Sequence, residues 1–278
     1  MQTGPRLRPT AILPSLITLG NLACGLGAFI WVMDAAAKNR PELLMYAGWL
    51  MVIAALFDGI DGKVARLTQG TSDLGAQLDS LCDAVTFGVA PAMLARGLVL
   101  LEGPGMELRM HPRLLVVTPI LYACCAVLRL ARFNAEDQGA EAGESDRSFI
   151  GLPSPAAAAV PITLVLTYFA LSDPNLILPL SENQVFWLKA TILRILPLIL
   201  VLLGALMVSR IRYPHSLAWL RRTKRPFPRI AEIVLIGGIL LVEPELTMLL
   251  VAFLFMATPA VTSLVAFLRR HGWLTSRP

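Results

Sequence analysis

The sequence predicts an all-α, polytopic membrane protein that crosses the bilayer about eight times and forms one domain, residues 1–278. Of the 278 residues, 56% are hydrophobic and only 15% are charged, and the mean hydropathy is +0.66. This composition is far from that of a soluble globular domain. Apolar runs of about 20 residues recur along the chain, long enough to span a bilayer as helices. Short polar joints separate them, so we expect no appended soluble domain.

The predicted spans follow the apolar runs in order. They cover residues 14–34, 43–66, 74–100, 113–134, 155–172, 188–209, 228–242 and 245–268. Charged or Pro/Gly-rich joints end the helices, such as residues 38–42 after the first span and 102–105 after the third. The seventh run is the shortest, so hydropathy defines its boundaries least well.

The basic residues orient these spans. With the N-terminus in the cytoplasm, most of the 24 Lys and Arg residues fall on the cytoplasmic side, including the joint 210–229. We therefore predict a protein of the cell membrane with both termini in the cytoplasm. The basic joint would attract anionic lipid headgroups, at about 1 kcal/mol per Lys or Arg. Because the basic residues follow the membrane boundary, nucleic-acid binding is not expected.

Four aspartates interrupt the apolar sequence at helical spacing. Asp58 and Asp61 are three residues apart at the cytoplasmic end of the second span. Asp79 and Asp83 are four residues apart in the first turns of the third. Each pair therefore projects from one face of its helix. The short joint near residues 68–73 makes the two helices antiparallel neighbours, so we expect all four carboxylates to meet at one cytoplasmic rim.

Carboxylates at membrane depth are costly, and four together repel one another unless cations neutralise them. Oxygen ligands suit Mg²⁺, Mn²⁺ or Ca²⁺ rather than zinc, and two such ions about 3.5–4 Å apart would serve displacement at phosphorus. Gly59, Gly62 and Gly75 leave room for a ligand at the backbone. Arg66 could pair with a phosphate. Solvated carboxylates at helix ends would be the structural alternative.

The pattern Asp-x2-Asp-Gly-x2-Ala-Arg-x8-Gly-x3-Asp-x3-Asp, over residues 58–83, resembles the signature of the CDP-alcohol phosphatidyltransferases. The resemblance implies the fold of that family, and two divalent ions, Mg²⁺ or Mn²⁺, held by the four aspartates. It also implies that Asp83 is the general base, and that Gly62, Arg66 and Ser72 hold the CDP moiety. The homodimer that we expect is likewise a property of the family.

Other polar residues at the same face extend the predicted site. Thr18 and Asn21, one turn apart in the first span, could hydrogen-bond the nucleotide. Two pairs of arginines are candidates for the carboxylate of an acceptor and for the lipid phosphate: Arg129 with Arg132, and Arg210 with Arg212. Read alone, each pair would be an ordinary anchor on the cytoplasmic side.

These segments, with residues 151–156 and the eight predicted spans, resemble the integral-membrane phosphatidylserine synthase branch of the family. The resemblance implies transfer of a phosphatidyl group from CDP-diacylglycerol to L-serine, which gives phosphatidylserine and CMP. Glycerol 3-phosphate or inositol phosphate remain alternative acceptors. A divalent-cation transporter is a more distant alternative, since it would need acidic residues at several depths and the four aspartates gather at one end.

Overall fold

The structure is a computed structural model that describes residues 12–67, 73–108, 110–138, 149–174, 176, 179–213, 237 and 242–270. Within these ranges the secondary structure is almost wholly helical. The elements are α1 (Ile12–Lys38), α2 (Leu43–Leu67), α3 (Asp73–Asp83), the π-helix η2 (Ala84–Val89), α4 (Ala90–Glu102), the 3-10 turn η3 (Pro104–Met106), α5 (Leu114–Gln138), β1 (Phe149–Ile150), α6 (Ser154–Ala170), α7 (Glu182–Val208), β2 (Arg212–Tyr213) and α10 (Pro244–Arg270).

The all-α membrane class is confirmed. Among the described residues, six helical segments are long and apolar enough to cross a bilayer, and they match the first, second, third, fourth, sixth and eighth predicted spans. The fifth predicted span is the shorter apolar helix α6, which has 17 residues. The seventh, residues 228–242, lies outside the described residues except for 237 and 242. The count of eight spans therefore stays a prediction.

The sixth predicted span starts inside a longer helix. Helix α7 begins at Glu182 rather than at residue 188, because a capping box starts it before the apolar run. The Ser181 hydroxyl accepts a hydrogen bond from the backbone N–H of Gln184, and the Gln184 side chain accepts one from the backbone N–H of Ser181.

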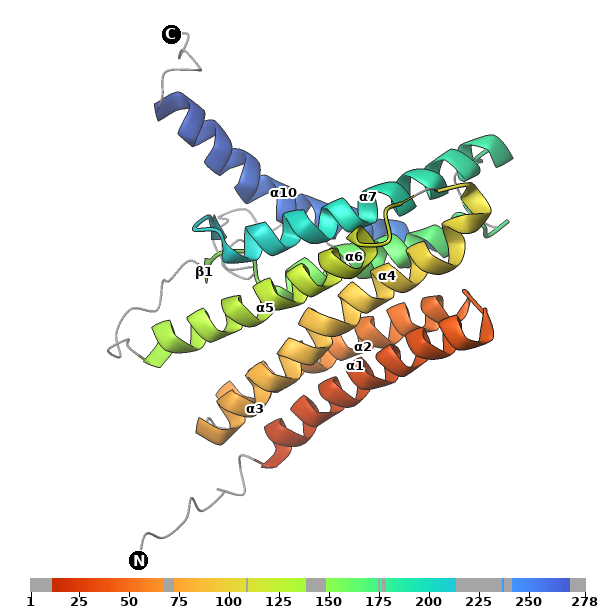
Figure 1. Ribbon diagram of the computed structural model, residues 1–278. Helices are drawn as coiled ribbons and strands as arrows, with labels where there is room; N and C mark the ends of the chain where they lie inside the picture. The colour runs from red at the N-terminus through yellow and green to blue at the C-terminus, as the bar shows by residue number, and fades with distance from the viewer. Residues whose placement is uncertain are drawn as a thin grey trace, which may run out of the picture.

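The helices pack side by side along one direction, while α10 diverges from them toward its C-terminal end (Figure 1). Helix α1 packs mainly on α2, α5 on α7, and α6 on α10. Close approach between α1 and the π-helix depends on Gly25, where an added Cβ would lie 2.5 Å from Thr86 Oγ1. The two strands form one antiparallel pair between the start of α6 and the end of α7.

Helix α3, the π-helix η2 and helix α4 follow one another without a gap and form one helical rod. The π-helix begins directly after Asp83. A π-helical turn leaves backbone groups that need partners outside the helix, and such turns are frequent at functional sites. Here the buried Tyr122 hydroxyl of α5 donates to the Phe87 carbonyl at 3.1 Å. The turn thus ties the aspartate-bearing end of the rod to α5.

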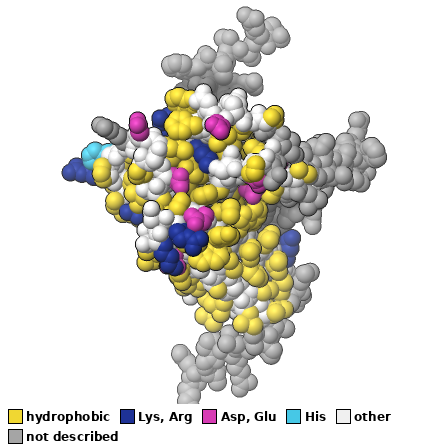
Figure 2. All heavy atoms as spheres, turned by 90° about the vertical axis from the view of Figure 1, so that its right-hand side faces the viewer, with side chains coloured by type: hydrophobic (Ala, Val, Ile, Leu, Met, Phe, Trp, Pro, Cys, Tyr) yellow, Lys and Arg dark blue, Asp and Glu magenta, His cyan; other side chains and the backbone are white. Residues whose placement is uncertain are grey.

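Charged side chains gather among hydrophobic ones at the end of the molecule that lies on the right of Figure 1, as Figure 2 shows. The turn between α1 and α2 carries two ion pairs, Lys38–Asp34 at 2.9 Å and Arg40–Glu42 at 2.8 Å. The hydrogen bond from Arg40 holds the pKa of Glu42 below its ordinary value. Along the helices, exposed side chains such as Leu16 and Leu198 are apolar, as lipid contact requires.

Candidate metal and nucleotide site

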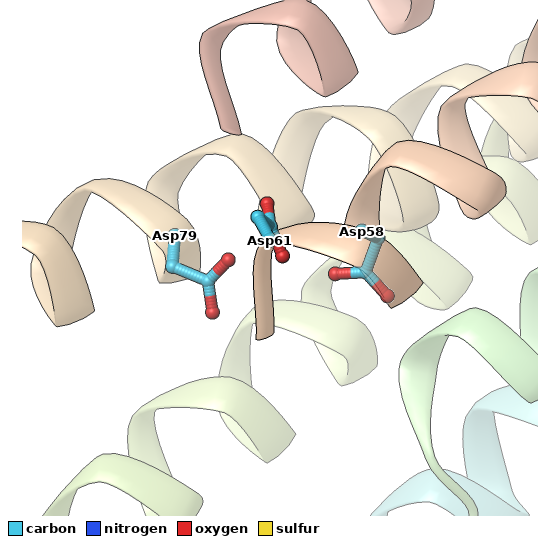
Figure 3. A group of neighbouring side chains, drawn as sticks. All are labelled: Asp58, Asp61 and Asp79. Atoms are coloured by element: carbon cyan, nitrogen blue, oxygen red, sulfur yellow. The ribbon is translucent and has the colours of Figure 1, made fainter. Parts of the chain in front are cut away.

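Helices α2 and α3 bring three aspartates together. Asp58 and Asp61 project from α2 and Asp79 from α3, and one carboxylate oxygen of each lies within 4.8 Å of the others. Figure 3 shows Asp61 between Asp58 and Asp79, with the carboxylates turned toward the space that they share. The predicted convergence of these three side chains is therefore present in the structure.

Asp83 lies beside this group of three rather than within it. Its carboxyl interacts with that of Asp58, and Asn21 Nδ2 donates to Asp83 Oδ1 at 3.4 Å. Asp83 is only 8% exposed, and it ends α3 where the π-helix begins. Of the four aspartates, Asp83 is thus held by neighbouring side chains on two sides.

The acidic cluster fits a hard divalent cation. Every ligand atom it offers is a carboxylate oxygen, which is the donor that Mg²⁺, Mn²⁺ and Ca²⁺ prefer. Asp61 is 4% exposed, and its Oδ2 atom has no hydrogen-bond partner in the described part of the chain. No Lys or Arg side chain described here forms an ion pair with any of the four. The cluster therefore has buried negative charge that a cation could neutralise.

The glycines of the motif open the surface beside these carboxylates. A Cβ added at Gly59 or Gly62 would meet no described atom within 4 Å, and Gly62 is exposed. Gly75 lies half-buried on α3. Arg66 belongs to α2, but its side chain is outside the described residues, and so is the whole of Ser72. The predicted contacts of Arg66 and Ser72 with the nucleotide thus stay predictions.

Thr18 and Asn21 of α1 both lie against the aspartates. The Thr18 hydroxyl donates to the Pro14 carbonyl at 3.0 Å and interacts with the Asp61 carboxylate. Asn21 is fully buried; besides its bond to Asp83, its backbone carbonyl accepts a hydrogen bond from Thr86 at 3.5 Å. Asn21 therefore contacts the predicted general base directly.

The structure separates the four candidate arginines. Arg129 is buried, donates to Ser154 Oγ at 2.7 Å and is close enough to Asp83 for their charges to interact. Arg132 instead donates to the carbonyls of Ile150 at 2.6 Å and Val208 at 3.3 Å, which joins α5 to β1 and α7. Arg210 is exposed after α7, and the side chain of Arg212 in β2 is outside the described residues. Among the candidate arginines whose side chains the structure describes, Arg129 is the one beside the aspartates.

A further polar contact at this end did not follow from the sequence. Asn134 Nδ2 of α5 donates to Ser80 Oγ of α3 at 2.9 Å, next to Asp79. Two sequence features could have pointed to this contact. Ser80 directly follows the predicted ligand Asp79, and Asn134 follows the two candidate arginines of α5. Their pairing joins residues 54 positions apart, which no local pattern specifies.

The structure is an all-α bundle of the membrane class, with acidic side chains that could hold a metal ion converging at one end. Sequence comparison identifies the family. Residues 11–193 match the model of the CDP-alcohol phosphatidyltransferase family, so the chain belongs to it. The match covers α1 to α6 and the first part of α7; β2 and α10 lie beyond it.

Three relatives are named CDP-diacylglycerol–serine O-phosphatidyltransferase. The Helicobacter pylori protein is 32% identical over 209 residues, which are 75% of this chain and 74% of the relative. The Bacillus subtilis protein is 30% identical over 208 residues, 73% of this chain and 90% of the relative. The Mycobacterium tuberculosis protein is 39% identical over 155 residues, 55% of this chain and 49% of the relative.

Proposed function

We propose that this protein transfers the phosphatidyl group of CDP-diacylglycerol to L-serine and releases CMP. The observation that carries the proposal is the convergence of Asp58, Asp61 and Asp79 within 4.8 Å at the motif of the family. The choice of serine is supported by the names of the three relatives, two of which align with more than 70% of this chain.

The four aspartates are the residues that would hold the divalent ions, Mg²⁺ or Mn²⁺. When bound, such ions neutralise the charge of the diphosphate and of the transition state. The open backbone at Gly59 and Gly62 leaves room for the nucleotide, and we assign its remaining contacts to Arg66, Ser72 and Gly75. Thr18 and Asn21 lie against the carboxylates. We therefore assign them to the wall of the nucleotide site nearest Asp61 and Asp83.

Asp83 acts as the general base in this proposal. It takes the proton of the serine hydroxyl while that oxygen forms a bond to the phosphorus attached to diacylglycerol. The bond from this phosphorus to the CMP oxygen breaks, and CMP leaves with the electron pair. Asn21 Nδ2 donates to Oδ1 of Asp83, which restricts the orientation of this carboxyl group. The buried position of Asp83 keeps bulk water from competing with serine.

Arg129 is the arginine that the geometry favours for the serine carboxylate. It lies beside Asp83, and a guanidinium pairs with a carboxylate through two parallel hydrogen bonds. Arg132 already donates to two backbone carbonyls, so we assign it to holding the helix ends together. Arg210 and Arg212 stay candidates for the lipid phosphate.

We also propose that the aspartate end faces the cytoplasm, with both termini, and that the protein is a homodimer. The orientation rests on the distribution of Lys and Arg along the chain. Labelling of a cysteine introduced at Arg210 by a membrane-impermeant reagent should require opened cells. Native mass measurement in detergent should give twice the mass of 30.2 kDa, and a monomer would refute the dimer.

The proposal is tested with the purified full-length chain in lipid vesicles that contain CDP-diacylglycerol. CMP release and phosphatidylserine formation should both require L-serine and either Mg²⁺ or Mn²⁺. The same assay is repeated with glycerol 3-phosphate, inositol phosphate and inositol. Faster CMP release with a phosphorylated acceptor would replace serine, and no release with any acceptor would reject the transferase proposal.

A further inference from the structure

One arginine lies within a membrane-spanning segment, far from the aspartates. Arg96 follows Asp83 by 13 residues on the rod formed by α3, η2 and α4, which is about 20 Å along a helix axis. It precedes Glu102, the last residue of α4, by six residues. A charged side chain at this depth is costly, so it is expected to have a partner and a function.

Arg96 replaces a hydrogen bond that Pro119 cannot make. Proline has no N–H, so the carbonyl of Leu115, four residues earlier in α5, lacks its usual partner within the helix. The Arg96 Nε–H donates to this carbonyl at 3.0 Å. The guanidinium is therefore held at the first turn of α5, where the apolar side chains of Leu114 and Val117 are exposed.

The Nη groups of Arg96 have no hydrogen bond and no ion pair in the described part of the chain. The hollow beside Arg96, between α4, α5 and α7, has a volume of about 10 Å³, which holds about one water molecule and no larger anion. Arg113, exposed two residues before Leu115, adds a second positive charge that forms no ion pair with a described residue. An anionic partner for Arg96 must therefore come from the bilayer.

We propose that Arg96 binds the phosphate of an anionic phospholipid in the leaflet that faces away from the aspartates. The two Nη groups of a guanidinium can hold a phosphate through parallel hydrogen bonds. Arg96 and Arg113 would repel an ammonium in the headgroup, and no described carboxylate forms an ion pair with either arginine. The site therefore favours phosphatidylglycerol, whose headgroup has no cation, over phosphatidylethanolamine. This inference does not depend on the proposed transferase activity.

The Arg96 site is separate from the polar contacts of Glu102 on the same helix. Glu102 accepts a hydrogen bond from Tyr168 of α6 at 2.6 Å, whereas Arg96 donates to α5. The two charged residues of α4 thus contact different neighbouring helices. A lipid bound at Arg96 should therefore stabilise the packing of α4 on α5 and leave the contact with α6 unchanged.

The test measures binding of phosphatidylglycerol to the purified full-length protein by native mass spectrometry. Loss of Arg96 alone would also remove the hydrogen bond to the Leu115 carbonyl. Arg96→Met is therefore combined with Pro119→Ala, which returns a backbone N–H to this carbonyl. Pro119→Ala alone should bind phosphatidylglycerol within about threefold of the parent protein, because the guanidinium remains. The double variant should bind about tenfold more weakly or worse.

The matched control is Arg40→Met, which changes an arginine at the same end that is already paired with Glu42. This variant should bind phosphatidylglycerol as the parent protein does. The parent should bind phosphatidylethanolamine and inorganic phosphate more weakly than phosphatidylglycerol, by about tenfold or more. Equal binding of phosphatidylglycerol by Pro119→Ala and the double variant would overturn the proposal. Equal binding of phosphatidylethanolamine by the parent would show a site for any lipid, and equal binding of inorganic phosphate would show a site for free anions; either result also overturns it.

Discussion

The two ends of the helix bundle hold buried polar groups in opposite ways. At the aspartate end, four carboxyl groups approach one another, and Asp61 Oδ2 has no partner in the described part of the chain. At the other end, Tyr168 of α6 donates to Glu102 Oε2 of α4 at 2.6 Å. The ammonium of Lys189 on α7 lies 4.6 Å from the centre of the Tyr168 ring and donates to Ser172 Oγ.

The difference indicates which end needs a partner from outside the protein. Around Tyr168, a carboxylate, a phenol and an ammonium satisfy one another, so that cluster contributes to stability by joining three helices. Around Asp61, like charges are held close together, and no described Lys or Arg side chain forms an ion pair with them. Such an arrangement is unfavourable in the empty protein and is typical of a site that binds metal ions. We therefore expect changes at the aspartate end to affect activity, and changes around Tyr168 to affect stability.

Metal removal should produce the largest effect. Chelation with EDTA should lower CMP release by on the order of 10³ or more, because the charge of the diphosphate is no longer neutralised. Return of excess Mg²⁺ or Mn²⁺ should restore the rate. In the described residues the far end contains no comparable acidic group. Protein treated with EDTA should therefore unfold at the same temperature as protein prepared without metal. Full activity in excess chelator would refute the metal site.

Asp83→Asn should lower kcat by about 10²–10⁴, because the amide cannot accept the serine proton. The matched control is Asp34→Asn, which changes an exposed aspartate that is paired with Lys38 at the opposite end. We expect the control to keep the parent rate in the same CMP-release assay. If Asp83→Asn were fully active, another group would have to be the base.

Asn21→Leu should lower kcat by about 10- to 100-fold, in the range found when a group that orients a reactive residue is removed. The leucine cannot donate to Asp83 Oδ1, so the carboxylate loses its fixed orientation. The KM for serine should change less than kcat, and the pH dependence of kcat should shift because Asp83 loses a hydrogen-bond donor. Asn183→Ala, an exposed asparagine of α7 at the far end, is the control. A loss of thermal stability with an unchanged pH profile would indicate that Asn21 only supports the fold.

The sequence predicted those features that depend on local spacing. Hydropathy is a property of continuous runs, so it located the spans that the described residues contain. The i, i+3 spacing of Asp58 and Asp61 and the short joint to α3 sufficed to predict that they meet Asp79. The capping box at Ser181 is also local, but the sixth span was placed from hydropathy alone, so its start at residue 188 came after the start of α7 at Glu182.

Features that depend on long-range packing were not predicted. Asn21 and Asp83 are 62 residues apart, so nothing local to either shows that they pair. Arg132 looks like Arg129 in sequence, but the chain folds the carbonyls of Ile150 and Val208 onto it. The π-helix after Asp83 likewise arises from how the helices fit together. Such fits depend on packing between helices, which a single sequence does not specify.

The smallest effect on catalysis is expected at the far end, where stability should change instead. Tyr168→Phe removes the hydrogen bond to Glu102 and keeps the ring beneath Lys189, so the carboxylate loses its neutral donor but the cation–π contact remains. The free energy of unfolding should fall by about 1–3 kcal/mol. Thermal unfolding in detergent measures this loss, and Tyr46→Phe, whose tyrosine is 48% exposed, is the control.

The rate of CMP release at low temperature should match that of the parent protein, because Tyr168 and Glu102 lie at the opposite end of α4 and α6 from the aspartates. If Tyr168→Phe instead lowered the rate as much as Asn21→Leu does, the two ends would be coupled through the bundle and the separation of stability from function would be wrong.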